Sequence, residues 1–236
     1  MRIEDHQWCF ERARIVLRND RRPGLRLVNK FADEINRGLE EADVGLMDVE
    51  TPFGDIPVAP VMHFLDPYTN MGLGGWISIG LGAVTNAALF CDACFNIARK
   101  LWQKGDQSLS MRVFGIALHL VQDLTVPHHA RCTVLFKHSE YEHWVHEHIN
   151  ETSNVPVKDG FYSNEMFPAQ WVYANAREAY GYFGYCDGIN LNLWRPRSWV
   201  FKKDDFALVR DMMVPLAVRT SAGFTDYFLS KLSIEH

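Results

Sequence analysis

The segment Leu118–His129 reads Leu-His-Leu-Val-Gln-Asp-Leu-Thr-Val-Pro-His-His and places two polar residues on one side of an apolar helix. His119 and Asp123 are four residues apart, so their side chains project from the same helix face. Pro127 ends the helix, and His129 follows where the chain has turned. An imidazole and a carboxylate are costly to bury unless a partner satisfies them, and a divalent metal such as zinc is a common partner. For this motif taken alone, a surface His–Asp pair is the alternative interpretation.

A second pair with the same spacing follows. His138 and Glu142 are also four residues apart and face one way on the next helix. The other polar residues of that helix, at 143, 146, 147 and 148, fall mostly on other faces and indicate a partly exposed side. His128 is not expected to share an ion with His129, because adjacent residues rarely reach one ion without backbone distortion. Two such pairs close together favour a metal cluster.

Helices are expected along most of the chain outside this segment. Glycine and proline are sparse and clustered, and no series of segments alternates apolar and polar residues with period two, so a sheet-based core is not expected. The sequence predicts an all-α, single-domain multi-helix bundle over residues 1–236. The expected helices cover residues 6–19, 24–41, 76–104, 108–125, 138–150, 165–183 and 205–231.

One long proline-rich stretch interrupts the helical pattern. Residues 43–73 carry four prolines and are expected to form an irregular loop. Loops of this length in compact domains are usually functional or disordered. This loop holds Asp48 and His63, and His6 stands at the start of the first helix. Taken alone, Asp48 is most simply a turn residue, His63 a solvent-exposed residue and His6 a helix cap or surface residue.

Composition limits the classes of function that the chain can have. With 47% apolar and 22% charged residues it is an ordinary globular protein. Its net charge of -5 gives no basic face for duplex nucleic acid. No apolar run is long enough to span a membrane. The first residues lack the apolar core of a secretion signal, so the chain as read is expected in the cytoplasm, unless a leader was removed.

The five cysteines do not indicate a disulfide framework, because their number is odd and their spacing scattered. Cys91 and Cys94 have CxxC spacing, but they lie in an apolar helical stretch with no second CxxC. They are most simply interpreted as buried core thiols.

The ordered ligand residues resemble those of the bacterial zinc-dependent phospholipase C family, whose fold is shared with S1/P1-type nucleases. The family's His-x-x-x-Asp-x-x-x-Pro-x-His motif is matched from His119 to His129, and its His-Ser-x-Tyr-Glu motif from His138 to Glu142. Its Asp-x-Glu-x-Pro loop start resembles the segment at Asp48, and its His-Phe-x-Asp-Pro motif resembles the segment at His63. The resemblance covers nearly the whole chain.

The resemblance implies three zinc ions. One ion would be held by Asp48, His63, His119 and Asp123. A second would be held by His129, His138 and Glu142. The third would use His6, Asp123 and the amino and carbonyl groups of Met1, where the family's mature chain begins with Trp.

The resemblance also implies a reaction. Zinc-bound water, oriented by Asp48 or deprotonated by it as general base, would attack the phosphorus atom directly. The expected products are diacylglycerol and a phosphorylated headgroup. Choline-selective members carry Tyr after the first Asp and Phe three residues before the loop His. Val49 and Pro60 stand at these places, so the headgroup stays open.

Two other functions remain open at this point. A single-strand nuclease of the S1/P1 type would use a similar ligand set, although that branch typically has Asp as the last ligand and a longer insertion before it. A non-catalytic helical protein stabilised by zinc would keep the clusters without an open coordination position.

A phospholipid substrate implies transient contact with a membrane surface. Trp76, Trp194, Trp199 and Phe201 could form a docking rim, although interhelix packing explains most of them more simply. The basic, aromatic segment 195–203 is the best candidate for meeting anionic lipid, with a solvated loop as the alternative. The sequence does not indicate an oligomeric state.

Overall fold

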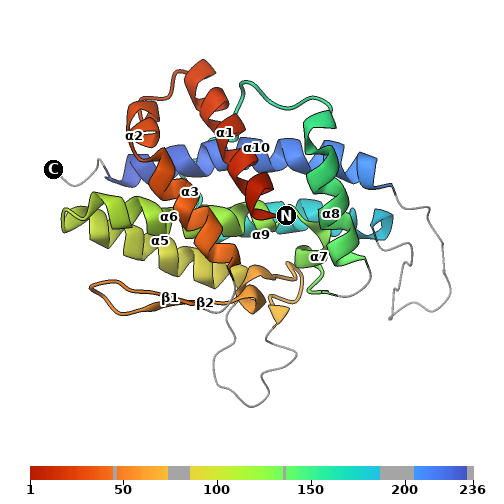
Figure 1. The fold of residues 1–236 in the computed structure, drawn as a ribbon, viewed down its shortest axis with the longest axis horizontal. Helices are drawn as coiled ribbons and strands as arrows, with labels where there is room; N and C mark the ends of the chain where they lie inside the picture. The colour runs from red at the N-terminus through yellow and green to blue at the C-terminus, as the bar shows by residue number, and fades with distance from the viewer. Residues whose placement is uncertain (45–46, 74–85, 135–136, 187–204, 233–236) are drawn as a thin grey trace, which may run out of the picture.

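The computed structural model describes residues 1–44, 47–73, 86–134, 137–186 and 205–232 and confirms the all-α fold (Figure 1). Its α-helices are α1 (Ile3–Asn19), α2 (Leu25–Lys30), α3 (Ala32–Asp43), α5 (Ala87–Gln103), α6 (Gln107–Asp123), α7 (Pro127–Ala130), α8 (His138–His148), α9 (Pro168–Tyr180) and α10 (Phe206–Leu232). Short 3-10 helices are η1 (Pro60–His63), η2 (Ile149–Glu151) and η3 (Phe183–Tyr185). Strands β1 (Met47–Val49) and β2 (Ile56–Val58) form an antiparallel hairpin.

Helix α6 is the centre of the bundle and carries the segment that the sequence singles out. It packs against α3, α5, α9 and α10. In Figure 1, α5, α6 and α10 run along the long axis of the molecule, while α1, α3 and α8 cross them. All residues from Val113 to Asp123 are buried. An apolar helix enclosed in this way belongs to the core, so the two polar ligand candidates at its end are held by the buried interior of the fold.

Helices α3 and α6 touch backbone to backbone at two glycines. A methyl group added to Gly38 would lie 1.9 Å from the carbonyl oxygen of Arg112, and one added to Gly115 would lie 2.3 Å from that of Ile35. Any larger side chain would therefore push the helices apart. The close approach also brings α3 backbone next to the polar end of α6.

Two expected elements differ from the structure. The helix expected over 24–41 is divided into α2 and α3 at Phe31, whose backbone leaves the helical region and whose buried ring packs edge-on against Trp102. No glycine or proline within that stretch marks the break. The expected irregular loop contains the β1–β2 hairpin, in which Ile56 and Val58 are buried and Pro57 is exposed. Strands of three residues are too short to show a period in the sequence.

Several expectations concern residues outside the described ranges. Of the helix expected over 76–104, residues 76–85 lie outside the described ranges, and the described part is α5 with its N-cap Asn86, whose side chain accepts a hydrogen bond from the Leu89 amide. The proposed docking residues Trp76, Trp194, Trp199 and Phe201 and the segment 195–203 lie outside those ranges. Cys91 and Cys94 are buried free thiols in α5. Among the helices that the structure describes, none has both the length and the apolar character needed to cross a bilayer.

Replacing Gly115 with alanine is expected to lower the free energy of unfolding by roughly 1–3 kcal/mol, the usual effect of overpacking a core. Gly181→Ala is the matched control, because its added methyl would meet its nearest neighbour, the Glu178 carbonyl oxygen, only at 3.7 Å. Denaturant unfolding of both variants measures the difference. Equal stability of the two variants would contradict the close α3–α6 contact.

Candidate metal centre

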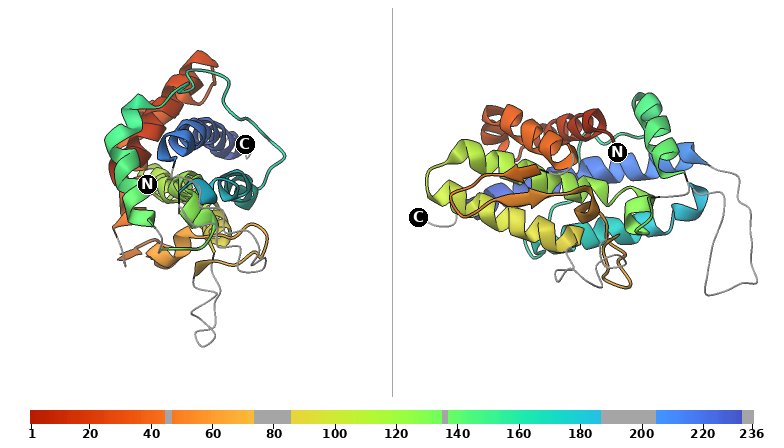
Figure 2. Two further views of the ribbon diagram at one scale, coloured as in Figure 1. Left: turned by 90° about the vertical axis from the view of Figure 1, so that its right-hand side faces the viewer. Right: turned by 60° about the horizontal axis from the view of Figure 1, so that its bottom comes forward.

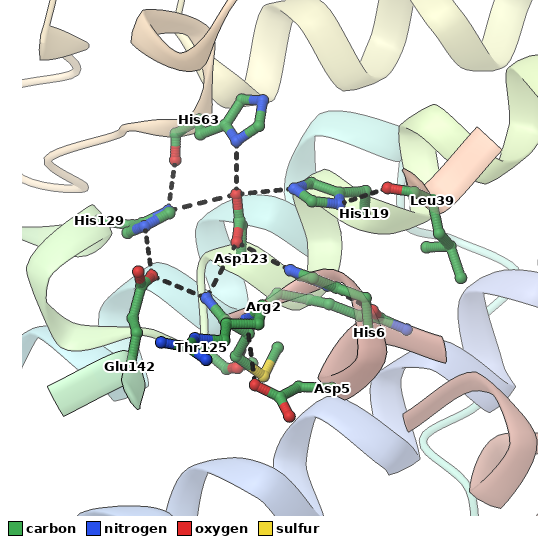
Figure 3. A network of polar contacts seen from close by, with 12 residues as sticks. Arg2, Asp5, His6, Leu39, His63, His119, Asp123, Thr125, His129 and Glu142 are labelled. Atoms are coloured by element: carbon green, nitrogen blue, oxygen red, sulfur yellow. Dashed lines mark hydrogen bonds and ion pairs between the residues drawn. The ribbon is translucent and has the colours of Figure 1, made fainter. Parts of the chain in front are cut away.

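The carboxylate of Asp123 lies at the end of α6 inside a buried ring of nitrogen atoms (Figure 3). Its Oδ2 is 2.8 Å from His63 Nδ1, 3.1 Å from His119 Nε2 and 3.3 Å from His129 Nδ1. Its Oδ1 is 3.3 Å from His6 Nε2. Asp123 is only 1% exposed, so its carboxylate is removed from bulk solvent and faces these nitrogen atoms instead.

Four separate elements bring the imidazoles to this carboxylate. The first turn of α1 carries His6, the end of η1 carries His63, α6 itself carries His119 one turn earlier, and α7 carries His129. Helix α6 ends at Asp123, and Pro127 begins the short helix α7, where the chain takes a new direction. As the spacing predicted, the two α6 side chains share a face, and the chain reversal returns His129 to the same carboxylate.

A second carboxylate, Glu142 of α8, lies beside the first. Its Oε1 is 2.8 Å from the Met1 amino nitrogen, 3.0 Å from His138 Nε2 and 3.3 Å from His129 Nε2. The Met1 amino nitrogen also lies 3.7 Å from Asp123 Oδ1. His129 Nε2 and His138 Nε2 are 3.0 Å apart. His129 therefore faces Asp123 with one ring nitrogen and Glu142 with the other.

Oxygen atoms outside the ring fix the orientation of two imidazoles. His119 Nδ1 donates to the Leu39 carbonyl at 3.1 Å, and His6 Nδ1 donates to Gln122 Oε1 at 2.7 Å. A neutral imidazole carries one proton, so a ring whose Nδ1 donates keeps a lone pair on Nε2 for a metal ion. His6 Nε2 and His63 Nε2 are buried and have no hydrogen-bond partner within the described part of the chain.

This arrangement fits a divalent cation. Lone pairs of imidazole and of carboxylate oxygen repel one another when they converge in a buried space, and a cation between them removes the conflict. In the described part of the chain, three sets of side chains place ligand atoms within 4.8 Å of one another. They are His6, His119 and Asp123; Asp43, His63 and His119; and His129, His138 and Glu142. Imidazole with carboxylate is a ligand set that suits zinc.

The charge states match what metal ligands require. Burial opposes charge on Asp123, but the neighbouring His129 and His119 hold its pKa well below the usual value. Burial likewise opposes charge on Glu142, but the Met1 ammonium and His129 hold its pKa well below the usual value. Burial lowers the pKa of His6, His63 and His138. The two carboxylates are thereby ionised and His6, His63 and His138 neutral, the forms that bind metal. His129 differs, because Asp123 raises its pKa to about 9 against the effect of burial, so it would release a proton on binding a metal ion.

Asp48 is the one predicted ligand that the structure does not bring into this cluster. It lies on β1 opposite Pro57, and its side chain is exposed, because the neighbouring Val49 takes the buried face of the strand. A different carboxylate, Asp43 at the end of α3, groups with His63 and His119. Asp43 lies five residues before Asp48, and no sequence motif marks it. Sequence reasoning therefore missed it.

The other histidines that the structure describes, at 128, 143, 146 and 148, belong to none of these three sets. His143 pairs with Glu147 on the exposed side of α8, and His146 pairs with the buried Asp5. His128 is buried and stacks on the His138 ring, with ring centroids 5.1 Å apart.

The cluster opens into a cavity of about 600 Å³. Its polar wall includes Asp43, His63, His129, His138, Glu142 and the Met1 amino end. Its apolar wall includes Pro60, Val61, Phe64, Leu73 and Val134. The candidate ligands thus border a space large enough for a small molecule.

Comparisons with known proteins support the resemblance seen in the motifs. No family profile matches the chain. A protein of Listeria monocytogenes named phospholipase C is 23% identical over 97% of this chain and 78% of its own length. The solved alpha toxin of Clostridium absonum has a TM-score of 0.74 at 18% identity, and that of Clostridium perfringens has 0.72 at 16%. Both superpose on 98% of this chain, which spans 64% of each toxin chain. The fold is thus that of the alpha toxins, and the likeness to a bacterial phospholipase C is confirmed.

Asparagine substitutions of the two aspartates separate the sequence and structure assignments. Asp43→Asn is expected to weaken zinc binding by at least about tenfold, because the amide loses the charge that a ligand carboxylate supplies. Asp48→Asn should bind zinc like the parent protein, because its side chain is exposed. Competition with a chelator of known affinity measures both. Weakened binding in Asp48→Asn alone would restore the assignment made from the motif.

Proposed function

We propose that this chain is a zinc-dependent phosphodiester hydrolase that cleaves glycerophospholipids into diacylglycerol and a phosphorylated headgroup. The observation that carries the proposal is the Asp123 carboxylate ringed by imidazoles, two of which, on His63 and His129, line an open cavity. A site that only stabilised the fold would not need an adjoining space of about 600 Å³. The likeness to a Listeria protein named phospholipase C supports the same reaction.

The chain's own residues divide the work. The three ligand sets, together with the Met1 amino group, would hold zinc ions. When bound, such ions lower the pKa of water toward 7 and neutralise phosphate charge. Asp43 is half-buried in the cavity wall beside His63, where its carboxylate would orient the attacking water and accept its proton. This is the role that the resemblance gave to Asp48.

An aliphatic rim at the cavity mouth supports a lipid substrate over a nucleic acid. Val61 and Val134 line the cavity and are 42% and 51% exposed, and Val44, next to Asp43, is 60% exposed. Proteins that bind single-stranded nucleic acid use exposed aromatic rings and a basic groove instead. Exposed aliphatic side chains around a polar centre suit a substrate with a charged headgroup and acyl chains, and they suit transient contact with the surface of a bilayer.

Side-by-side assays test the substrate. We expect the zinc-loaded protein to release diacylglycerol from phosphatidylcholine or phosphatidylethanolamine vesicles and to leave single-stranded DNA intact. A chelator should abolish turnover and added zinc should restore it, because the reaction needs metal-activated water. Cleavage of DNA alone would identify a nuclease. Bound zinc without turnover of either substrate would indicate a structural metal site.

The aliphatic rim can be tested separately. Val61→Asp and Val134→Asp should each slow hydrolysis of vesicles roughly fivefold, since about 1 kcal/mol of apolar contact with the bilayer is lost per residue. Hydrolysis of a short-chain, monomeric phospholipid should change little. Val157→Asp is the matched control, because Val157 is 55% exposed but does not line the cavity. Equal losses on vesicles and monomers would mean that the valines do not contact the bilayer.

A further inference from the structure

The structure assigns a positioning role to Gln122, which orients His6 for metal binding and is itself held by Ser221 of α10. The assignment rests on the proposed zinc site, and it concerns side chains that do not bind the ion themselves. Gln122 stands at an unspecified position of the His-x-x-x-Asp motif, and Ser221 lies outside it. The contact joins the most central helices of the fold to the first turn of α1.

The hydrogen bonds form a short chain through the core. His6 Nδ1 donates to Gln122 Oε1 at 2.7 Å, and Gln122 Nε2 donates to Ser221 Oγ at 3.0 Å. His6, Gln122 and Ser221 are each 0% exposed. Water therefore does not compete for these groups, and the amide of Gln122 is the partner that decides which nitrogen of His6 carries the proton.

This choice of nitrogen matters for the ligand set. Because Nδ1 donates to the amide, Nε2 keeps its lone pair and points toward Asp123 Oδ1 at 3.3 Å. Nε2 has no hydrogen bond of its own in the described part of the chain. A ring free to adopt the other tautomer would donate from Nε2 to Asp123 and lose its value as a ligand. Partners behind ligating histidines typically contribute 10–100-fold to metal affinity.

His6 has particular need of such a partner. The Leu39 carbonyl fixes His119 from the backbone of α3, whereas the described contacts of the His6 ring with oxygen atoms come from the side chains of Gln122 and Asp123. A backbone carbonyl remains when residue 39 is changed, but the Gln122 amide does not survive substitution. The ion held by His6 and Asp123 therefore depends on residue 122.

Substitution of Gln122 tests the assignment. Gln122→Met keeps the length of the side chain but removes the acceptor, and we expect one zinc to bind about 10–100-fold more weakly while the others are retained. Gln122→Glu keeps an acceptor for Nδ1 and should restore binding of that zinc. Stoichiometry and affinity are measured by titration against a chelator. Nitrogen-15 NMR of the His6 ring in the zinc-free protein should show the proton on Nδ1 in the parent protein and a mixture of tautomers in Gln122→Met.

Asn175 provides the matched control. This buried amide donates to the Val121 carbonyl and to Thr220 Oγ1, so it joins α9 to α6 and α10 in the same layer without touching a ligand. Asn175→Leu should lower stability but leave all zinc affinities unchanged. If Gln122→Met binds every zinc as the parent protein does, or if Asn175→Leu shows the same loss, the assignment to Gln122 is wrong. A parent protein that binds no zinc would overturn the proposed function instead.

Discussion

The buried carboxylate of Asp123 is the constraint on which the rest of the structure depends. An ionised carboxylate removed from water costs several kcal/mol unless neighbouring groups compensate it. Here the carboxylate is surrounded by imidazoles on α1, η1, α6 and α7, and a cation among them would supply the compensation. None of these elements can move without exposing or isolating the charge. The positions of α1, η1 and α7 are therefore all set by contacts with the two carboxylate oxygens of Asp123.

The packing of α6 makes this precision possible. The helix is enclosed from Val113 onward, and the glycine contact with α3 sets its depth and places the Leu39 carbonyl against His119. The right panel of Figure 2 shows the β1–β2 hairpin lying along the helices. The helix η1, which ends at His63, follows β2 directly in the chain. The packing of the core therefore also fixes the position of the ligands, because the helix that fills the core ends in the site.

The sequence predicted the features that are local and regular. Spacing of four residues located His119 with Asp123 and His138 with Glu142, and proline at 127 located the turn before His129. The break at Phe31 was not predictable, since no glycine or proline marks it and the ring contact of Phe31 with Trp102 joins residues far apart in the sequence. Asp43 was missed for a related reason. Both it and Asp48 are acidic residues near the start of the loop, and only the hairpin pairing decides which one turns toward the histidines.

The site also shows how strongly it attracts positive charge. Burial alone would lower the pKa of the Met1 amino group and of His129. Instead, Glu142 and Asp123 raise the pKa of the first to about 11, and Asp123 raises that of the second to about 9. The two carboxylates therefore favour the protonated, positively charged forms of the Met1 amino group and of His129. His6 and His63 are neutral and add no positive charge, and the Nε2 atom of each is buried without a hydrogen-bond partner in the described part of the chain. Bound cations would satisfy both nitrogen atoms. Zinc bound there would compensate the charges that the fold has buried, and its binding free energy would add to the stability of the folded state.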